Sequence, residues 1–241
     1  MVASRAAHGA GEAVTTPDRS WRDLYRIGAV SAALYVLMII GPIVLLNIAP
    51  LPPLTGGAAL LEYIAAHKLV YMAEFVSFVG LCVPAMIVFL ALYVALKELN
   101  PSYAALGALL GIASEITALA YNSSPPSLHT GLLYLSDQYI AATSDAQRAT
   151  LATAAEALMA ASNTVNPAGI LTALAMLIVS LVMLKGVFPR SVAYLGSATG
   201  AIGIVSETLR DVIGPGYYVY GLLLPAWFLA VGWRLYRLGR D

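Results

Sequence analysis

Residues 27–46 have the sequence IGAVSAALYVLMIIGPIVLL, which contains no charged side chain. A helix of about 20 apolar residues matches the hydrocarbon core of a bilayer, which is roughly 30 Å thick. Arg19, Arg22 and Arg26 precede this stretch. A cleavable signal peptide would have a shorter apolar region that ends at a small-x-small site, whereas this stretch continues into NIAP at 47–50. We therefore predict a retained membrane-spanning helix.

The composition of the whole chain agrees with a membrane protein. Of 241 residues, 60% are hydrophobic and 11% are charged, against the roughly 25% charged residues of soluble domains. The 13 basic and 13 acidic residues cancel, so the expected partner is the lipid bilayer and not a nucleic acid. The single cysteine, Cys82, lies in an apolar stretch, and no H-x-x-x-H or H-E-x-x-H pattern occurs. We therefore predict no metal site and no cofactor.

Five further apolar stretches are about as long as a bilayer requires. They cover residues 69–96, 103–121, 167–184, 192–209 and 217–233, and each is near the ~20 residues of a spanning helix. The sequence thus predicts an all-α, polytopic transmembrane helical bundle of six spans, which forms a single domain over residues 21–241. Residues 1–20 are rich in Ala, Gly, Ser and Thr without apolar periodicity, which predicts a disordered cytoplasmic tail.

The distribution of Lys and Arg predicts the orientation of these spans. On one side, in both tails and in the second and fourth connections, lie Arg5, Arg19, Arg22, Arg26, Lys97, Lys185, Arg190, Arg234, Arg237 and Arg240. On the other side lie Lys68, Arg148 and Arg210. Because short cytoplasmic loops carry an excess of Lys and Arg, both termini are expected in the cytoplasm.

The long connections on the extracytoplasmic side are predicted to contain amphipathic helices. Residues 57–68 have the pattern of one such helix, and residues 122–166 have the pattern of two more. We expect these helices to lie on the outer membrane surface as a lid. Asn166 followed by Pro167 then predicts the start of the fourth span, because the amide can cap the helix and proline is tolerated in its first turn.

Two helical hairpins share a sequence pattern. LKELNP at 96–101 and AALG at 104–107 resemble LKGVFP at 184–189 and AYLG at 193–196. A duplication about an axis along the membrane normal would explain this likeness, as in some transporters. Convergence would explain it equally well, because short cytoplasmic hairpins between apolar helices favour Lys and Pro.

Each of these hairpins carries a pair of glycines four residues apart. Gly107 and Gly111 form the first pair, and Gly196 and Gly200 form the second. Such G-x-x-x-G pairs expose a strip of backbone that lets another helix approach closely. We therefore predict tight helix packing at both pairs.

Three glutamates fall inside the predicted spans, where a charge costs about 2.5 to 3.5 kcal/mol on insertion scales. Glu74, Glu115 and Glu207 are expected at similar depth in the outer half of the membrane. Together with Arg210 and His129 nearby they make a candidate ligand-binding site. Such a site could bind a cation, hold a proton or act as a general acid.

The same side chains also have an ordinary structural explanation. Glu207 could pair with Arg210 at i,i+3, and Glu74 could reach Lys68 or the histidine before it. Glu115 has no basic residue within two turns of its own helix, so it is the strongest candidate for a site. No catalytic residue is assigned.

Several short motifs resemble a known family. They are LSDQY at 135–139, DAQR at 145–148, MLK at 183–185, AYLG at 193–196 and RLYRLG at 234–239. From about residue 24 to its end, the chain resembles a family of bacterial multi-pass membrane proteins described only as a domain of unknown function. The resemblance implies a six-helix fold in the bacterial inner membrane, and it transfers no catalytic residue.

Three hypotheses for function remain open. The first is a bundle that binds a small apolar or cationic ligand, such as a lipid-derived molecule, in an outward-facing pocket near Glu115. The second is a membrane-embedded enzyme on a prenyl or other lipid substrate, with Glu115 or Glu207 as general acid. The third is a transporter built on the hairpin repeat, for which six spans would require a homo-oligomer such as a dimer.

Overall fold

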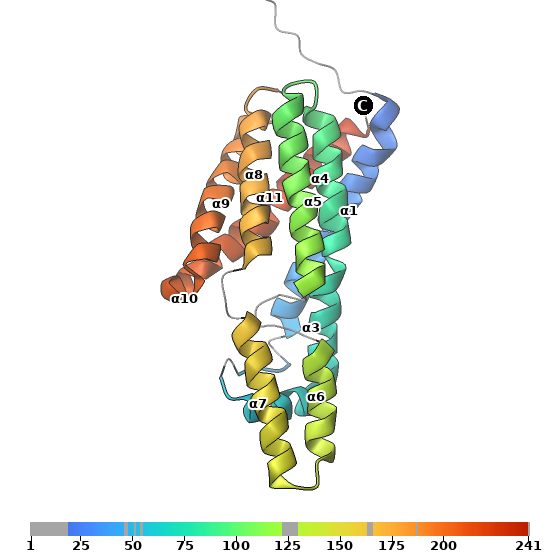
Figure 1. Ribbon diagram of the computed structural model, residues 1–241. Coiled ribbons are helices and arrows are strands. Elements are labelled where there is room, and N and C mark those ends of the chain that lie inside the picture. Colours follow the sequence, from blue (N-terminus) through green and yellow to red (C-terminus); the bar gives the residue numbers. More distant parts are fainter. Residues whose placement is uncertain are drawn as a thin grey trace, which may run out of the picture.

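The computed structural model consists of helices joined by turns and short connections (Figure 1). It describes residues 19–45, 48–50, 52–53, 55–121, 130–162, 166–186 and 188–240. No strand occurs in these ranges, which confirms the predicted all-α class. Of the features predicted from the sequence, His129 lies outside the described residues, and so does the tail at 1–20 except for residues 19 and 20.

Six long helices pack side by side as a bundle (Figure 1). They are α1 (Arg22–Leu45), α4 (Cys82–Leu96), α5 (Pro101–Tyr121), α8 (Pro167–Met183), α9 (Arg190–Thr208) and α11 (Tyr217–Leu238). Their main contacts follow this order and return from α11 to α1. In the described part of the chain the bundle is therefore a closed ring in which the first and the last helix are neighbours.

Shorter elements extend and connect the helices of the ring. The 3-10 helix η1 (Arg19–Trp21) precedes α1, and α3 (Lys68–Gly80) continues into α4 after a break at Leu81. The helix α10 (Arg210–Ile213) and the 3-10 helix η2 (Gly214–Gly216) lead from α9 to α11. The break at Leu81 comes three residues before Pro84, which cannot donate a helical hydrogen bond.

Aromatic side chains fill the interior of the ring. Trp227 and Phe228 of α11 and Phe89 of α4 are fully buried. Tyr35 of α1 stacks on Phe228 with 3.8 Å between the ring centroids. The outer faces are apolar as well, for example at Ile27, Val30, Leu34, Leu37, Leu90, Leu109 and Leu222. Helices that are apolar both inside and outside are typical of membrane spans.

Four helices in the described ranges are long and apolar enough to cross a membrane: Arg22–Pro42, Lys68–Leu96, Pro101–Ala120 and Tyr217–Leu238. They coincide with the first, second, third and sixth predicted spans. The predicted fourth span is α8, which is apolar but has 17 residues and is therefore only about 26 Å long. The predicted fifth span, α9, is rich in Gly, Ser and Thr. Length and composition thus support four spans, and the number six stays a prediction.

The predicted G-x-x-x-G contacts are confirmed, and both pairs have a glycine against α8. A Cβ atom on Gly107 of α5 would lie 2.5 Å from Cγ1 of Val179. A Cβ atom on Gly200 of α9 would lie 2.7 Å from the carbonyl oxygen of Ala173. Since real side chains do not approach so closely, these glycines allow α5 and α9 to pack tightly on α8.

A second assembly of three helices lies at one end of the bundle, at the bottom of Figure 1. It consists of α2 (Gly57–Ala66), α6 (Thr130–Ala141) and α7 (Asp145–Ser162), which occupy the positions of the predicted connecting helices. A separate hydrophobic cluster holds it together and includes Tyr71 of α3; its members are Leu60, Leu61, Ile64, Tyr71, Leu132, Ala155 and Met159. Lys68 at the start of α3 binds both carboxylate oxygens of Asp137 on α6, at 2.8 and 2.9 Å. We call this unit the three-helix assembly.

Candidate functional site

All three glutamates singled out from the sequence are buried. The exposed fraction is 5% for Glu74, 4% for Glu115 and 3% for Glu207. Within the part of the chain that the structure describes, none of them forms an ion pair. Their surroundings differ, and this difference distinguishes a candidate site from a structural contact.

Glu207 is held by hydrogen bonds to both of its carboxyl oxygens. The Tyr217 hydroxyl donates to Oε1 at 2.8 Å, and the Asn166 amide donates to Oε2 at 3.3 Å. The carboxyl group lies against the first turn of α8, where a Cβ atom on Gly169 would overlap it. The N-terminal end of a helix favours negative charge. Glu207 therefore ties the end of α9 to the start of α8.

The start of α8 has the predicted form. Pro167 occupies the first turn, and Oδ1 of Asn166 accepts a hydrogen bond from the Gly169 backbone N–H at 3.2 Å. The side chain of Asn166 thus has two functions, because its oxygen caps α8 while its amide nitrogen binds Glu207.

The predicted pairing of Glu207 with Arg210 is indirect. The Arg210 guanidinium lies 4.9 Å from the centre of the Tyr217 ring, and its Nη2 reaches the Tyr217 hydroxyl at 3.4 Å. The same hydroxyl donates to Glu207. Tyr217 therefore stands between the two charged groups and connects them.

Glu74 lies apart from the other two glutamates. Its expected partner, Lys68, binds Asp137 instead. Glu74 lies near Tyr71 and Tyr63, both of which belong to or pack against the hydrophobic cluster of the three-helix assembly. In the described ranges, no interaction connects it to Glu115 or Glu207.

Among the described residues, the groups that could donate to Glu115 on α5 are weak or shared hydrogen-bond donors. The Cys82 thiol and the Ser114 hydroxyl lie near its carboxyl group, but the thiol is hydrogen-bonded to the Phe78 carbonyl oxygen at 3.7 Å. A thiol is a weak donor, and a serine hydroxyl has a single hydrogen. Ser114 also lies 2.6 Å from the carbonyl oxygen of Gly111, which competes for that hydrogen, while Thr172 of α8 donates to Ser114 at 2.9 Å. Glu115 is thus much less well satisfied than Glu207.

Two buried tyrosines lie in the interior of the ring in the region of Glu115 and Glu207. They are Tyr35 of α1, which is near Glu115, and Tyr220 of α11, which is near both glutamates. Cys82 on α4 and Thr172 on α8 also belong to this cluster of polar side chains. Each of the six helices of the ring therefore supplies a side chain to the cluster. We call this set of residues, with Ser114 and Tyr217, the interior polar network.

The comparison with protein families covers nearly the whole described chain. A family model, Domain of unknown function (DUF4386), matches residues 27–239. The chain belongs to this family. The match begins in the first turns of α1 and ends just after α11, so the DUF4386 region includes the ring and the three-helix assembly. Neither the curated proteins nor the solved structures gave a match.

Of the predicted site residues in the DUF4386 region, Glu115, Glu207 and Arg210 fall in or beside the interior polar network, and Glu74 does not. The sequence analysis missed Tyr35 and Tyr220. Tyr35 stands near the middle of an apolar stretch, away from the headgroup depth that tyrosines prefer. The position of Tyr35 within an apolar stretch was the signal in the sequence that could have pointed to this residue.

Proposed function

We propose that this DUF4386 protein is a six-span membrane protein that binds a small apolar or cationic ligand, lipid-derived in its simplest form, at Glu115. The observation that carries the proposal is the state of this carboxyl group. It is 4% exposed and has no cationic partner among the described residues. A buried ionisable group in a membrane is costly, and when it has no charge partner the default hypothesis is a functional site.

The neighbours of Glu115 favour a ligand with a positive charge and an apolar body. A cation would supply the charge partner that Glu115 lacks, and the rings of Tyr35 and Tyr220 could add cation–π attraction. The hydrophobic core of the ring consists of apolar and aromatic side chains, which suit a hydrocarbon portion. Long-chain amines and quaternary ammonium lipids combine these two properties.

The membrane arrangement that we propose places both termini in the cytoplasm of a bacterium and the protein in its inner membrane. Two features support this arrangement. The start of α1, the α4–α5 and α8–α9 turns and the end of α11 lie at one end of the bundle, opposite the three-helix assembly (Figure 1). In addition, α8 and α9 complete the ring between the candidate spans α5 and α11. The three-helix assembly would then lie at the outer surface as a lid.

The proposal is tested by thermal unfolding of the purified protein in detergent, with Glu115→Gln beside Glu207→Gln. Both changes keep the shape of the side chain and remove its charge. We expect Glu115→Gln to melt at the same or a higher temperature than the wild type, because the carboxyl group is kept at a cost in stability. Glu207→Gln should melt lower, because Tyr217 and Asn166 donate to both oxygens of its carboxyl group.

The ligand class is tested in the same assay with dodecyltrimethylammonium and with the small cation tetraethylammonium as probes. We expect dodecyltrimethylammonium to raise the melting temperature of the wild type, and we expect Glu115→Gln to abolish this increase. Glu207→Gln should keep it. If neither cation nor any added lipid changes the melting of the wild type, or if Glu115→Gln responds as the wild type does, the proposal is wrong.

A further inference from the structure

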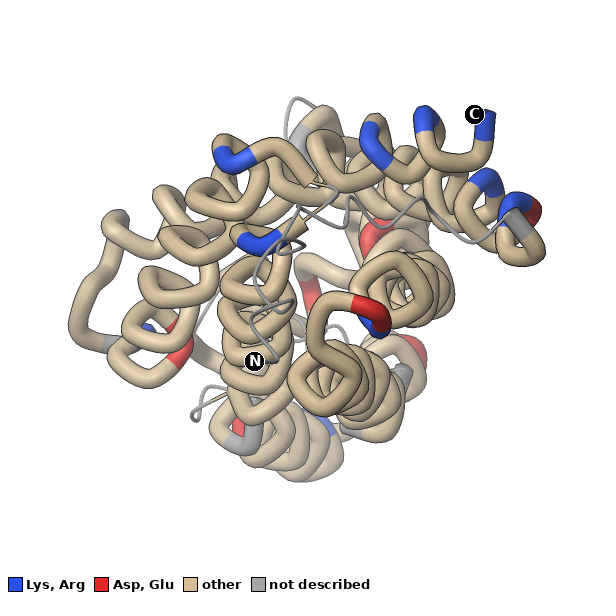
Figure 2. Tube along the Cα trace, turned by 90° about the horizontal axis from the view of Figure 1, so that it is seen from above, with Lys and Arg blue, Asp and Glu red and all other residues tan. Residues whose placement is uncertain are grey.

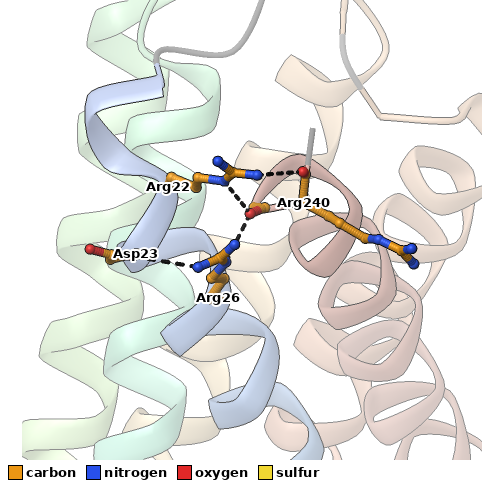
Figure 3. Close-up of polar contacts among 5 residues, drawn as sticks. Arg22, Asp23, Arg26 and Arg240 are labelled. Carbon is orange, nitrogen blue, oxygen red and sulfur yellow. Dashed lines mark hydrogen bonds and ion pairs between the residues drawn. The ribbon is translucent and has the colours of Figure 1, made fainter.

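The first turns of α1 are joined to the two residues that follow α11 by two arginines (Figure 3). Nε of Arg22 and Nε of Arg26 each donate to the Gly239 carbonyl oxygen at 2.9 Å. Nη2 of Arg22 also donates to the Arg240 carbonyl oxygen at 2.6 Å. A Cβ atom on Gly239 would lie 2.8 Å from Cγ of Arg26, so a larger residue would separate the two helices. We call this contact the α1–α11 seam.

The positive charge at the seam is poorly balanced. Arg22 and Arg26 share one neutral acceptor, the Gly239 carbonyl, so two like charges are held close together. Among the described residues, the one carboxylate in ion-pair distance of either guanidinium is that of Asp23, which is 3.9 Å from Arg26 and 92% exposed. So exposed a pair contributes little.

More basic residues surround the seam. Arg234, Arg237 and Arg240 lie on the final turns of α11 and just after it, and Figure 2 shows Lys and Arg positions grouped beside the C-terminus. The next residue in the sequence, Asp241, is acidic and lies outside the described residues.

Exposed aromatic side chains next to the seam indicate its depth. The exposed fraction is 41% for Trp21, 65% for Trp233 and 44% for Tyr236. Trp233 and Tyr236 stack with 5.9 Å between their ring centroids. Exposed Trp and Tyr on a membrane bundle lie at the level of the lipid headgroups. The arginines of the seam therefore lie where lipid phosphates are.

We propose that the α1–α11 seam binds the phosphate of an anionic phospholipid through Arg22 and Arg26. Each guanidinium has five N–H donors in a planar fork that matches phosphate oxygens. The bonds to the Gly239 and Arg240 carbonyls use some of these donors and orient the others. A phosphate would also supply negative charge, of which the described residues offer these arginines only the exposed carboxylate of Asp23. This site is separate from Glu115 and does not depend on the function proposed above.

The test is native mass spectrometry of the full-length protein after incubation with equal amounts of phosphatidylglycerol and phosphatidylcholine. We expect the wild type to retain several-fold more phosphatidylglycerol. The double change Arg22→Gln with Arg26→Gln should abolish this preference. Arg190→Gln, which removes a charge at the same end of the bundle but on α9, is the matched control and should keep it.

A substitution that removes a negative charge from the seam, instead of a positive one, separates lipid binding from a purely structural role. Asp23→Asn removes the acid beside Arg26, so it should increase the retention of phosphatidylglycerol, and this readout stands even if the double variant does not fold. Equal retention of the two lipids by the wild type would overturn the proposal, as would an equal loss in Arg190→Gln or no increase in Asp23→Asn. Glycerol phosphate, added at matched ionic strength, should not displace the lipid. Displacement would show a site for free phosphate instead.

Discussion

Glu207 and Glu115 are the same residue type at nearly the same degree of burial, yet their surroundings differ. Glu207 accepts from a tyrosine and an asparagine and lies at a helix N-terminus. Glu115 shares its one hydroxyl donor with a backbone carbonyl. Burial alone therefore does not identify a functional carboxyl group, because the number and strength of its donors decide how much the folded state stabilises it.

At the residue scale, Tyr217→Phe should destabilise the protein because it removes the 2.8 Å hydrogen bond to Glu207. The buried acceptor would lose a donor, which typically costs about 1–3 kcal/mol. Thermal unfolding in detergent measures the loss. Tyr218→Phe is the matched control, because Tyr218 is the next residue and is 66% exposed. In a Glu207→Gln background the loss should shrink, and an equal loss there would contradict this account.

At the scale of elements, the sequence predicted the helices well, but it predicted poorly which side chains of different helices contact each other. Residues 103–121 were predicted as a span, and α5 runs over Pro101–Tyr121, because apolar length is a property of one segment. Lys68, in contrast, binds Asp137, which is 69 positions away. The proximity of Glu115 to Cys82 was missed for the same reason. Such pairs depend on how each helix is rotated in the bundle, and one sequence does not specify this.

The packing of α8 between α5 and α9 gives a prediction of its own. Gly200→Ala should lower the melting temperature, because its Cβ atom would meet the Ala173 carbonyl oxygen and the Leu177 backbone nitrogen at 2.7 Å. Backbone atoms cannot move aside easily, and overpacking of this kind costs about 1–3 kcal/mol. Gly41→Ala in α1 is the control, since its nearest neighbour would be 3.9 Å away. Equal melting temperatures of the two variants would show that α8 and α9 can separate slightly without a loss of stability.

At the scale of the whole molecule, the number of spans is the prediction to test. Cysteine labelling with a membrane-impermeant maleimide, in a Cys82→Ser background, distinguishes four spans from six. The exposed positions are Glu98 in the α4–α5 turn, Thr143 between α6 and α7, and Ser191 at the start of α9. With six spans, intact cells should label the Thr143→Cys variant, whereas Glu98→Cys and Ser191→Cys should label only after permeabilisation. With four spans, Ser191→Cys would label in intact cells as well.

A ring that is closed by its first and last helices has a consequence for its biogenesis. The ribosome delivers α1 long before α11, so Tyr35 has no Phe228 to stack on, and Arg22 has no Gly239 carbonyl to bind, until α11 and the residues after it have been made. Each helix can insert as it is made, but the ring can close only afterwards. During synthesis, lipid or an insertion factor must therefore cover the face of α1 that α11 later buries.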